Sequence, residues 1–202
     1  MENIKETPLC KLAYEYGTDK CPRLKHVYTP FYYEMFKDRR KSVKKVLEMG
    51  IGFTKTMPHV AVIYDKGLKR NYQRGASLKM WRDFFPNAQI HGADIAPASM
   101  FEDDRIETHL CDETKVSDIE RLIEKTGSDI DLFVDDGLHK PWAQVFLAKT
   151  ILPLLNDDVT YIIEDVSHNR TITKQLSEYK CESPNLPNRK YRHGKLMVIT
   201  KK

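Results

Sequence analysis

The sequence of 202 residues predicts one α/β domain built on a doubly wound, mostly parallel β-sheet. Three observations support this fold class. Short apolar runs alternate with segments of helical periodicity, the runs are apolar enough to be buried on both faces, and most of them end in an acidic residue. Strands that alternate with helices pair in parallel and have both faces covered. In such sheets ligands bind beyond the carboxyl ends of the strands, which is where the acids of this chain fall.

The first half of the predicted domain has strands at residues 43–48, 89–95 and 105–110 and one well-marked helix at residues 77–85. The first strand is an apolar run that stops at a glycine turn. The helix carries its large apolar side chains on one face, namely Leu78, Trp81, Phe84 and Phe85. A Pro-Asn pair follows this helix and ends it.

The second half repeats the alternation. Its predicted elements are helices at residues 116–125, 142–155 and 171–179 and strands at residues 129–135, 159–164 and 195–200. Gly127 closes the first of these helices, and Pro153 ends or kinks the last turn of the second. We expect the final strand to pair with residues 178–182, and we expect Trp142 to lie in the core together with Trp81.

The composition is that of a globular protein, with 41% hydrophobic and 31% charged residues and a net charge of +4. This charge is too small to indicate a nucleic-acid partner. No apolar run reaches the length of a membrane span, and the N-terminus is too polar for a secretory signal. The four cysteines lack CxxC or zinc-ligand spacing, which favours free thiols in a reducing compartment. We therefore expect a cytoplasmic protein; a homo-oligomer is compatible with the sequence.

A Glu-x-Gly-x-Gly turn, formed by Glu48, Gly50 and Gly52, follows the first predicted strand. Such glycines permit a tight turn and a close backbone approach to a ligand. Position 55 is Lys55, so the third glycine of the dinucleotide pattern is absent, and Glu48 would repel a pyrophosphate. Asp94 ends the second strand, where an acid can hydrogen-bond ribose hydroxyls. A plain turn and a helix cap are the alternatives; the joint occurrence of Glu48 and Asp94 favours a nucleoside site.

Acids also end the fourth and fifth predicted strands, with Asp136 after the fourth and Glu164 and Asp165 after the fifth. Neighbouring strands lie about 4.8 Å apart, so these carboxylates can converge. Three carboxylates without Cys or a second His favour a hard cation such as Mg²⁺. His139 lies three residues after Asp136 and can accept a proton near neutral pH. Helix capping is the alternative, and it explains a buried Glu164 least well.

Several segments together resemble class I S-adenosylmethionine-dependent methyltransferases, and in particular the metal-dependent sugar O-methyltransferases of the macrocin and mycinamicin type. The Glu48–Gly52 turn followed by Asp94 is similar to motif I and the acidic motif after it. The segments similar to the sugar O-methyltransferases are residues 16–20, 26–32, 75–81, 85–88, 135–139 and 163–165. Leu138 stands where that family usually has Ser. Residues 57–74 match weakly and are interpreted as a variable insertion.

The resemblance implies a seven-stranded, Rossmann-like, mostly parallel sheet with a C-terminal antiparallel strand. It implies a single methyltransferase domain, residues 1–202, with a helical lid at residues 1–42 and a core at residues 43–202. The cofactor would be S-adenosylmethionine, and the residues assigned to it are Glu48, Gly50, Gly52, Asp94, Asp112, Ser77, Tyr28, Thr18 and Asp135. Asp112 could equally be a helix cap, and Tyr28 could equally serve helix packing.

The same resemblance implies Mg²⁺, or another divalent cation such as Mn²⁺, held by Asp136, Glu164 and Asp165, with His139 as the catalytic base. The leading hypothesis is a metal-dependent O-methyltransferase acting on a sugar hydroxyl, for example on a deoxyhexose of a glycan, glycoside or nucleotide sugar. A catechol-type or other small-molecule diol is the alternative acceptor, which a cavity rich in aromatic residues would favour. A non-catalytic nucleotide-binding module is the alternative of another class, and it predicts cofactor binding without metal binding.

Overall fold

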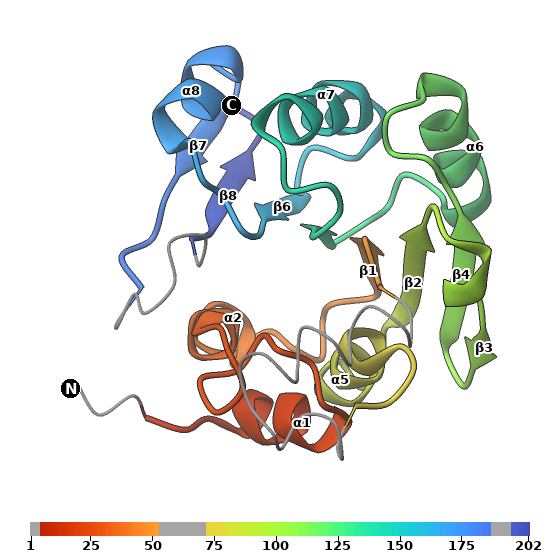
Figure 1. The fold of residues 1–202 in the computed structure, drawn as a ribbon, viewed down its shortest axis with the longest axis vertical. Coiled ribbons are helices and arrows are strands. Elements are labelled where there is room, and N and C mark those ends of the chain that lie inside the picture. Colours follow the sequence, from red (N-terminus) through yellow and green to blue (C-terminus); the bar gives the residue numbers. More distant parts are fainter. Residues whose placement is uncertain (1–4, 53–71, 187–194) are drawn as a thin grey trace.

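The computed structural model describes residues 5–52, 72–186 and 195–202. In these parts one β-sheet lies between two layers of helices (Figure 1). The strands are β1 (Lys45–Met49), β2 (Gln89–Asp94), β3 (Glu102–Asp103), β4 (Ile106–Leu110), β5 (Leu132–Asp135), β6 (Thr160–Ile163), β7 (Lys180–Glu182) and β8 (Met197–Thr200). The helices are α1 (Pro8–Tyr16), α2 (Tyr28–Phe36), α5 (Ala76–Phe84), α6 (Val116–Thr126), α7 (Pro141–Ile151) and α8 (Asn169–Gln175), with short 3-10 turns at Pro97–Ser99 and Leu152–Leu154.

The strand order is β3-β4-β2-β1-β5-β6-β8-β7. The five central strands from β4 to β6 are parallel, whereas β8 runs antiparallel between β6 and β7. This confirms the doubly wound, mostly parallel sheet and the antiparallel C-terminal strand. The described sheet has eight strands rather than the seven expected, because the two-residue β3 adds an antiparallel pair at the edge beside β4.

Alternate residues of the central strands are buried against opposite helix layers. On the side of α1, α2 and α5, Val46, Ile90 and Leu132 join one apolar cluster. On the side of α6, α7 and α8, Leu47 and Phe133 join the other. A strand buried on both faces has no polar alternation, which is why these runs are continuously apolar in the sequence.

The structure departs from the predicted elements at a few points. Trp142 is 58% exposed at the start of α7, so its prediction as a core residue was wrong, while Trp81 is fully buried as expected. The last turn after α7 is a 3-10 turn that contains Pro153, as its ring predicts. The helix expected at residues 171–179 is the shorter α8, and most of the expected insertion at residues 57–74 lies outside the described residues.

The first described helices belong to the packed layers. Tyr28, Tyr32 and Phe36 of α2 are buried, and Tyr32 packs edge-on against Trp81 of α5. No helix within the described ranges is long and apolar enough to cross a membrane.

Candidate active site

A cavity of about 430 Å³ opens at the carboxyl ends of β1, β2, β5 and β6. Eleven of the thirteen predicted site residues line it, namely Thr18, Glu48, Gly50, Gly52, Ser77, Asp94, Asp112, Asp136, His139, Glu164 and Asp165. Tyr28 and Asp135 do not line it, although both are buried beside lining residues. The position of the cavity is the one that the acidic strand ends predict for a sheet of this topology.

The glycine turn after β1 brings two loops into direct backbone contact. Gly50 has φ +85°, and a Cβ there would lie 2.2 Å from the carbonyl oxygen of Asp136. The Asp136 amide in turn donates to the carbonyl of Met49 at 2.9 Å. Only glycine permits both the left-handed backbone and this approach. The turn therefore places the predicted cofactor loop against the predicted metal loop.

Asp94 at the end of β2 is held by backbone amides of the same loops. Its Oδ2 accepts from the Gly52 amide at 3.0 Å, and its Oδ1 accepts from the Ala96 amide at 2.8 Å. These bonds fix the carboxylate at the rim of the cavity, beside the glycine turn. A carboxylate so placed can accept hydrogen bonds from the hydroxyls of a ribose.

Glu48, in β1 just before the glycine turn, is 1% exposed and lines the cavity. Its Oε2 accepts a hydrogen bond from Trp81 Nε1 at 2.6 Å, and its Oε1 lies 3.3 Å from the ammonium of Lys20. Burial raises the pKa of Glu48 above its ordinary value, although the Lys20 charge and the hydrogen bonds from Ser77 and Trp81 oppose the rise. The carboxylate is thus positioned toward a ligand rather than toward solvent.

Lys20 is the main site residue that sequence reasoning missed. Its ammonium is almost fully buried and lies 2.6 Å from Asp136 Oδ2, 2.6 Å from Glu164 Oε2 and 3.3 Å from Glu48 Oε1. Burial alone would lower the pKa of Lys20, but the three carboxylates raise it well above its ordinary value, so the ammonium stays charged. The residue falls in the segment 16–20, whose Thr18 was singled out. The sequence feature that could have pointed to Lys20 is the number of acids at the strand ends, because carboxylates that are buried together need a buried cation between them.

Two of the three tyrosines of α2 hold the acids that follow β6. Tyr28 donates from its hydroxyl to Asp165 Oδ1 at 2.6 Å, and Tyr32 donates to Glu164 Oε1 at 2.7 Å. Tyr28 therefore acts on the site through Asp165 and does not face the cavity where the cofactor was expected. Asp165 itself has φ +51°, a strained conformation for a residue other than glycine. Such strain is often found at functional sites.

Asp136, His139 and Asp165 form a group whose ligand atoms all lie within 4.8 Å of one another. His139 Nε2 is 3.1 Å from Asp136 Oδ1, and His139 Nδ1 is 3.5 Å from Asp165 Oδ2. Burial would lower the pKa of His139, but the hydrogen bond to Asp136 and the charges of Asp136 and Asp165 raise it to about 9. The pKa of Asp136 falls below its usual range, since Lys20 and His139 outweigh burial.

This group fits a divalent cation. Two carboxylates and an imidazole offer one ligand atom each within reach of a single ion, and Asp136 presents Oδ1 to the group while Oδ2 faces Lys20. The set differs from the predicted one in one member. Both carboxylate oxygens of Glu164 are engaged, one by Lys20 and one by Tyr32, so His139 takes its place among the converging atoms.

Three further acids surround the cavity. Asp112 accepts hydrogen bonds from the amide and hydroxyl of Thr114 within the loop before α6, whose N-cap residue is Lys115 and not Asp112. Glu113, which sequence reasoning did not single out, accepts from the Leu138 amide at 2.6 Å. Asp135 lies behind the cavity, where its Oδ2 accepts from Tyr161, and burial raises its pKa to about 8. Asp135 is therefore a supporting residue of the loop and not a direct lining residue.

Comparison with known proteins identifies relatives of this chain. The chain is 32% identical over 158 residues to 8-demethyl-8-(2-methoxy-α-L-rhamnosyl)-tetracenomycin-C 3'-O-methyltransferase of Streptomyces olivaceus, a match that covers 78% of this chain and 36% of the relative. It is 31% identical over 162 residues to mycinamicin VI 2''-O-methyltransferase of Micromonospora griseorubida, covering 80% of this chain and 37% of the relative. The chain thus spans little more than a third of the length of these curated relatives. No family model matches the chain.

A solved structure supports the fold. The MycE methyltransferase of the mycinamycin biosynthetic pathway, in complex with Mg and SAH, superposes with a TM-score of 0.73 at 22% identity, over 98% of this chain and 55% of that chain. The sequence relatives show the family, whereas this match and the strand order show the fold. The chain belongs to the S-adenosylmethionine-dependent methyltransferases related to the macrocin and mycinamicin sugar O-methyltransferases, and it has the class I methyltransferase fold.

Proposed function

We propose that the chain is the methyltransferase part of an S-adenosylmethionine- and Mg²⁺-dependent O-methyltransferase that methylates a sugar hydroxyl of a glycoside. One observation carries the proposal: a single cavity joins the glycine turn and Asp94 to the group formed by Asp136, His139 and Asp165. The glycine turn and Asp94 suit a nucleoside cofactor, and the group around Asp136 suits a divalent cation with a hydroxyl acceptor. The names of these two relatives specify methyl transfer to sugars of glycosides.

In this proposal the glycine turn admits the cofactor and Asp94 binds its ribose. Glu48 offers a buried carboxylate at the same side of the cavity, and the acids of the strand ends favour the positively charged sulfonium of S-adenosylmethionine over its neutral product. Thr18 and Ser77 line the same space and are proposed to contact the remaining part of the cofactor. Tyr28 and Asp135 support the loops instead.

At the other end of the cavity, Asp136 and Asp165 would hold Mg²⁺, with Glu164 held behind them by Lys20 and Tyr32. When bound, the metal makes an acceptor hydroxyl more acidic. His139 is the proposed base: the hydroxyl oxygen attacks the methyl carbon, the carbon–sulfur bond breaks, S-adenosylhomocysteine leaves, and the hydroxyl proton passes to His139. His139 can accept this proton only when one of its ring nitrogens is free of Asp136 and Asp165.

The lining of the cavity favours a sugar over a catechol. Among its described lining residues the aromatic rings are those of His26, Tyr72 and His139, whereas Asp and Glu side chains are numerous. A planar aromatic acceptor would find little ring surface for stacking, while a sugar diol can hydrogen-bond to carboxylates. This supports the sugar acceptor.

The proposal also covers the domain organisation and the cellular location of the protein. We propose that residues 1–202 act as one methyltransferase domain, in which residues 1–42 complete the cavity and residues 43–202 form the sheet and its outer helices. A cytoplasmic location is also proposed, because the four cysteines are free thiols, as is usual in a reducing compartment. Thr18 and Lys20, from the N-terminal part, line the cavity directly.

The test is a methyl-transfer screen with S-adenosylmethionine over rhamnosides, other deoxyhexosides and catechols, with Mg²⁺ and with EDTA. We expect product from at least one deoxyhexoside, loss of product with EDTA, and loss in Asp136→Asn and in His139→Ala. His168→Ala is the matched control, since His168 is exposed and outside the cavity. Transfer that persists with EDTA and in His139→Ala would contradict the metal and the base. Calorimetry without S-adenosylhomocysteine binding would contradict the cofactor site.

A further inference from the structure

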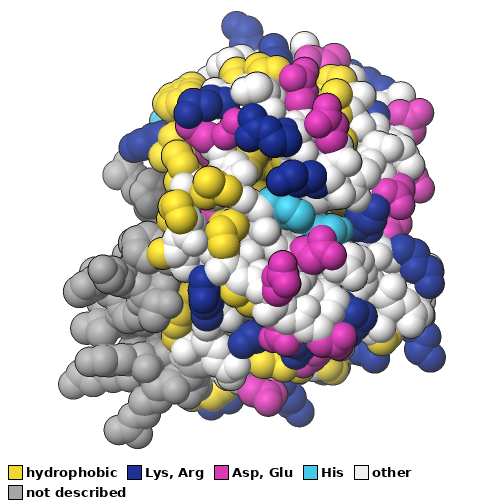
Figure 2. All heavy atoms as spheres, turned by 90° about the vertical axis from the view of Figure 1, so that its right-hand side faces the viewer, with side chains coloured by type: hydrophobic (Ala, Val, Ile, Leu, Met, Phe, Trp, Pro, Cys, Tyr) yellow, Lys and Arg dark blue, Asp and Glu magenta, His cyan; other side chains and the backbone are white. Residues whose placement is uncertain are grey.

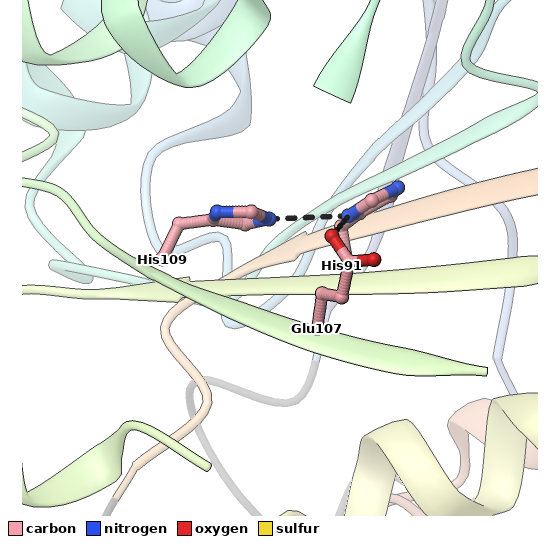
Figure 3. A group of neighbouring side chains, drawn as sticks. All are labelled: His91, Glu107 and His109. Carbon is pink, nitrogen blue, oxygen red and sulfur yellow. Dashed lines mark hydrogen bonds and ion pairs between the residues drawn. The ribbon is translucent and has the colours of Figure 1, made fainter. Parts of the chain in front are cut away.

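A second group of potential metal ligands lies on the sheet itself, away from the cavity. His91 of β2 and Glu107 and His109 of β4 come together on one face of these two parallel strands (Figure 3). The register explains the meeting, because His91 is the partner of Glu107 and His109 is two residues further along β4. Residues paired across parallel strands, and residues two apart on one strand, share a face.

The distances within this group match those of a coordination site. His91 Nδ1 lies 3.1 Å from His109 Nε2 and 3.8 Å from Glu107 Oε2, and the three ligand atoms lie within 4.8 Å of one another. Zinc–nitrogen bonds of about 2.0–2.1 Å at tetrahedral angles place neighbouring ligand atoms about 3.3–3.4 Å apart. The observed separations fall on either side of this value. Shifts of a few tenths of an ångström would bring the two pairs that include His91 to this separation, and the half-exposed Glu107 side chain can move to meet the ion.

The accessibility of the group also suits a metal ion. The side chain of His91 is only 6% exposed, whereas that of Glu107 is 56% exposed. An ion can therefore arrive from solvent along Glu107 and be held by a histidine that the sheet fixes in place. Figure 2 shows histidine side chains at the surface on the side of the molecule where β4 lies, among acidic and basic side chains.

The charges around the group are mixed. Glu107 supplies one negative charge, and Asp129 lies close enough to raise the pKa of His91. Lys45 and Lys125 act in the opposite direction, but Lys45 is bound to Asp129 and to the Thr126 carbonyl. Burial, His109 and Lys45 lower the pKa of His91 to about 4, and burial lowers that of His109 as well.

We propose that His91, Glu107 and His109 form a binding site for Zn²⁺ or a similar late first-row divalent ion, which fastens β4 to β2. Two imidazoles and one carboxylate are the donors of many zinc sites with an open fourth position. Imidazole nitrogens favour such ions over Mg²⁺, which prefers oxygen ligands. The site has two imidazoles and one carboxylate where the group around Asp136 has one imidazole and two carboxylates, and it does not depend on the proposed methyl transfer.

The test is equilibrium dialysis of the metal-free chain against Zn²⁺ in the presence of excess Mg²⁺, which occupies the oxygen-rich group, with Co²⁺ absorption as a report of nitrogen ligation. We expect one tightly bound zinc and a raised melting temperature. His109→Gln should weaken zinc binding more than about tenfold, because it removes a direct ligand. Glu107→Gln should weaken it as well, and both substituted side chains keep the size and polarity needed for folding.

Two controls separate this site from others. His168→Gln removes an exposed histidine elsewhere and should leave zinc binding unchanged. Asp136→Asn should also leave this zinc in place, since it alters only the cavity. Absence of zinc binding in the unsubstituted chain, or zinc affinity that is unchanged in His109→Gln, would overturn the proposal and leave His91 and His109 as a hydrogen-bonded pair.

Discussion

The burial of Lys20 explains how so many carboxylates can coexist at one end of the sheet. One ammonium lies within 3.3 Å of oxygens from Glu48 near the end of β1, Asp136 after β5 and Glu164 after β6. Charges removed from water are tolerated only when they are paired and hydrogen-bonded. Lys20 supplies the pairing, while Trp81 and Tyr32 supply hydrogen bonds to Glu48 and Glu164.

Replacing Lys20 with Met should therefore lower the free energy of unfolding by about 3–5 kcal/mol, the usual effect of leaving buried charges without their partner. Denaturation in urea measures this loss. The control is Lys37→Met, which removes a surface pair with Glu34 and should leave stability nearly unchanged. Mg²⁺ should stabilise Lys20→Met more than the unsubstituted chain, because the acids are then less neutralised. Equal stabilisation of both would contradict this electrostatic account.

His139 leads to a prediction about pH. In EDTA-treated protein its pKa should lie near 9, because Asp136 and Asp165 favour the protonated ring. A raised pKa means that the ring is protonated below pH about 9 and becomes able to accept a proton only above it. NMR titration should show this midpoint, Asp136→Asn should lower it toward the ordinary value, and Mg²⁺ should lower it in the unsubstituted chain. A midpoint near 6.5 in the metal-free protein would contradict the geometry.

At the scale of elements, the turn after β1 and the loop after β5 form one unit. The Asp136 amide donates to Met49, the Gly50 amide donates to Ala93, and no side chain fits between the turn and the Asp136 carbonyl. Three strand ends are thus locked at fixed spacing by backbone contacts. This is what positions the cofactor turn relative to the acids, independent of any ligand.

Gly50→Ala should break this unit. The left-handed backbone alone costs a residue with a Cβ about 1–2 kcal/mol, and contact with the Asp136 carbonyl adds to it. We expect lower stability together with lost binding of S-adenosylhomocysteine, measured by urea denaturation and calorimetry. Gly127→Ala is the matched control: its φ is +82°, but its Cβ would meet the movable side-chain ends of Asp129 and Lys45 rather than backbone, and it is not among the residues that line the cavity. It should lose stability and keep binding; equal loss of binding in both would refute the role of the turn.

The helices and strands were largely predictable from the sequence, whereas the contacts between side chains that are far apart in the chain were not. Apolar runs that end in acids identified β1, β2, β5 and β6, because a strand covered on both faces leaves a local pattern. Trp142 was misjudged because an apolar helix does not reveal which of its faces meets solvent. Lys20 escaped notice because its partners lie 116 and 144 positions away in the chain. The His91 and His109 pair likewise depends on strand register, which periodicity alone does not determine.

At the scale of the whole molecule, the N-terminal helices cover one face of the sheet and also serve the site. Tyr32 and Phe36 are fully buried, Tyr32 packs against Trp81, and Phe36 packs against Phe85. The same segment supplies Lys20 to the acids. Buried aromatic side chains contribute strongly to a core, since each removes about 150–250 Å² from water. The described N-terminal residues, 5–42, thus contribute to the packed interior as well as to the proposed cavity.

A chain that begins at residue 43 should accordingly fail to fold cooperatively. It would expose the apolar face of α5, including Trp81 and Phe85, and leave Glu48 and Glu164 buried without Lys20. We expect loss of the near-ultraviolet circular dichroism, binding of a hydrophobic dye and no sharp thermal transition, with Mg²⁺ and S-adenosylhomocysteine unable to restore them. The full chain measured alongside is the control. A truncated chain that melted cooperatively and still bound S-adenosylhomocysteine would show that residues 1–42 are a separable lid, and the buried contacts of α2 would then contribute far less to stability than their packing implies.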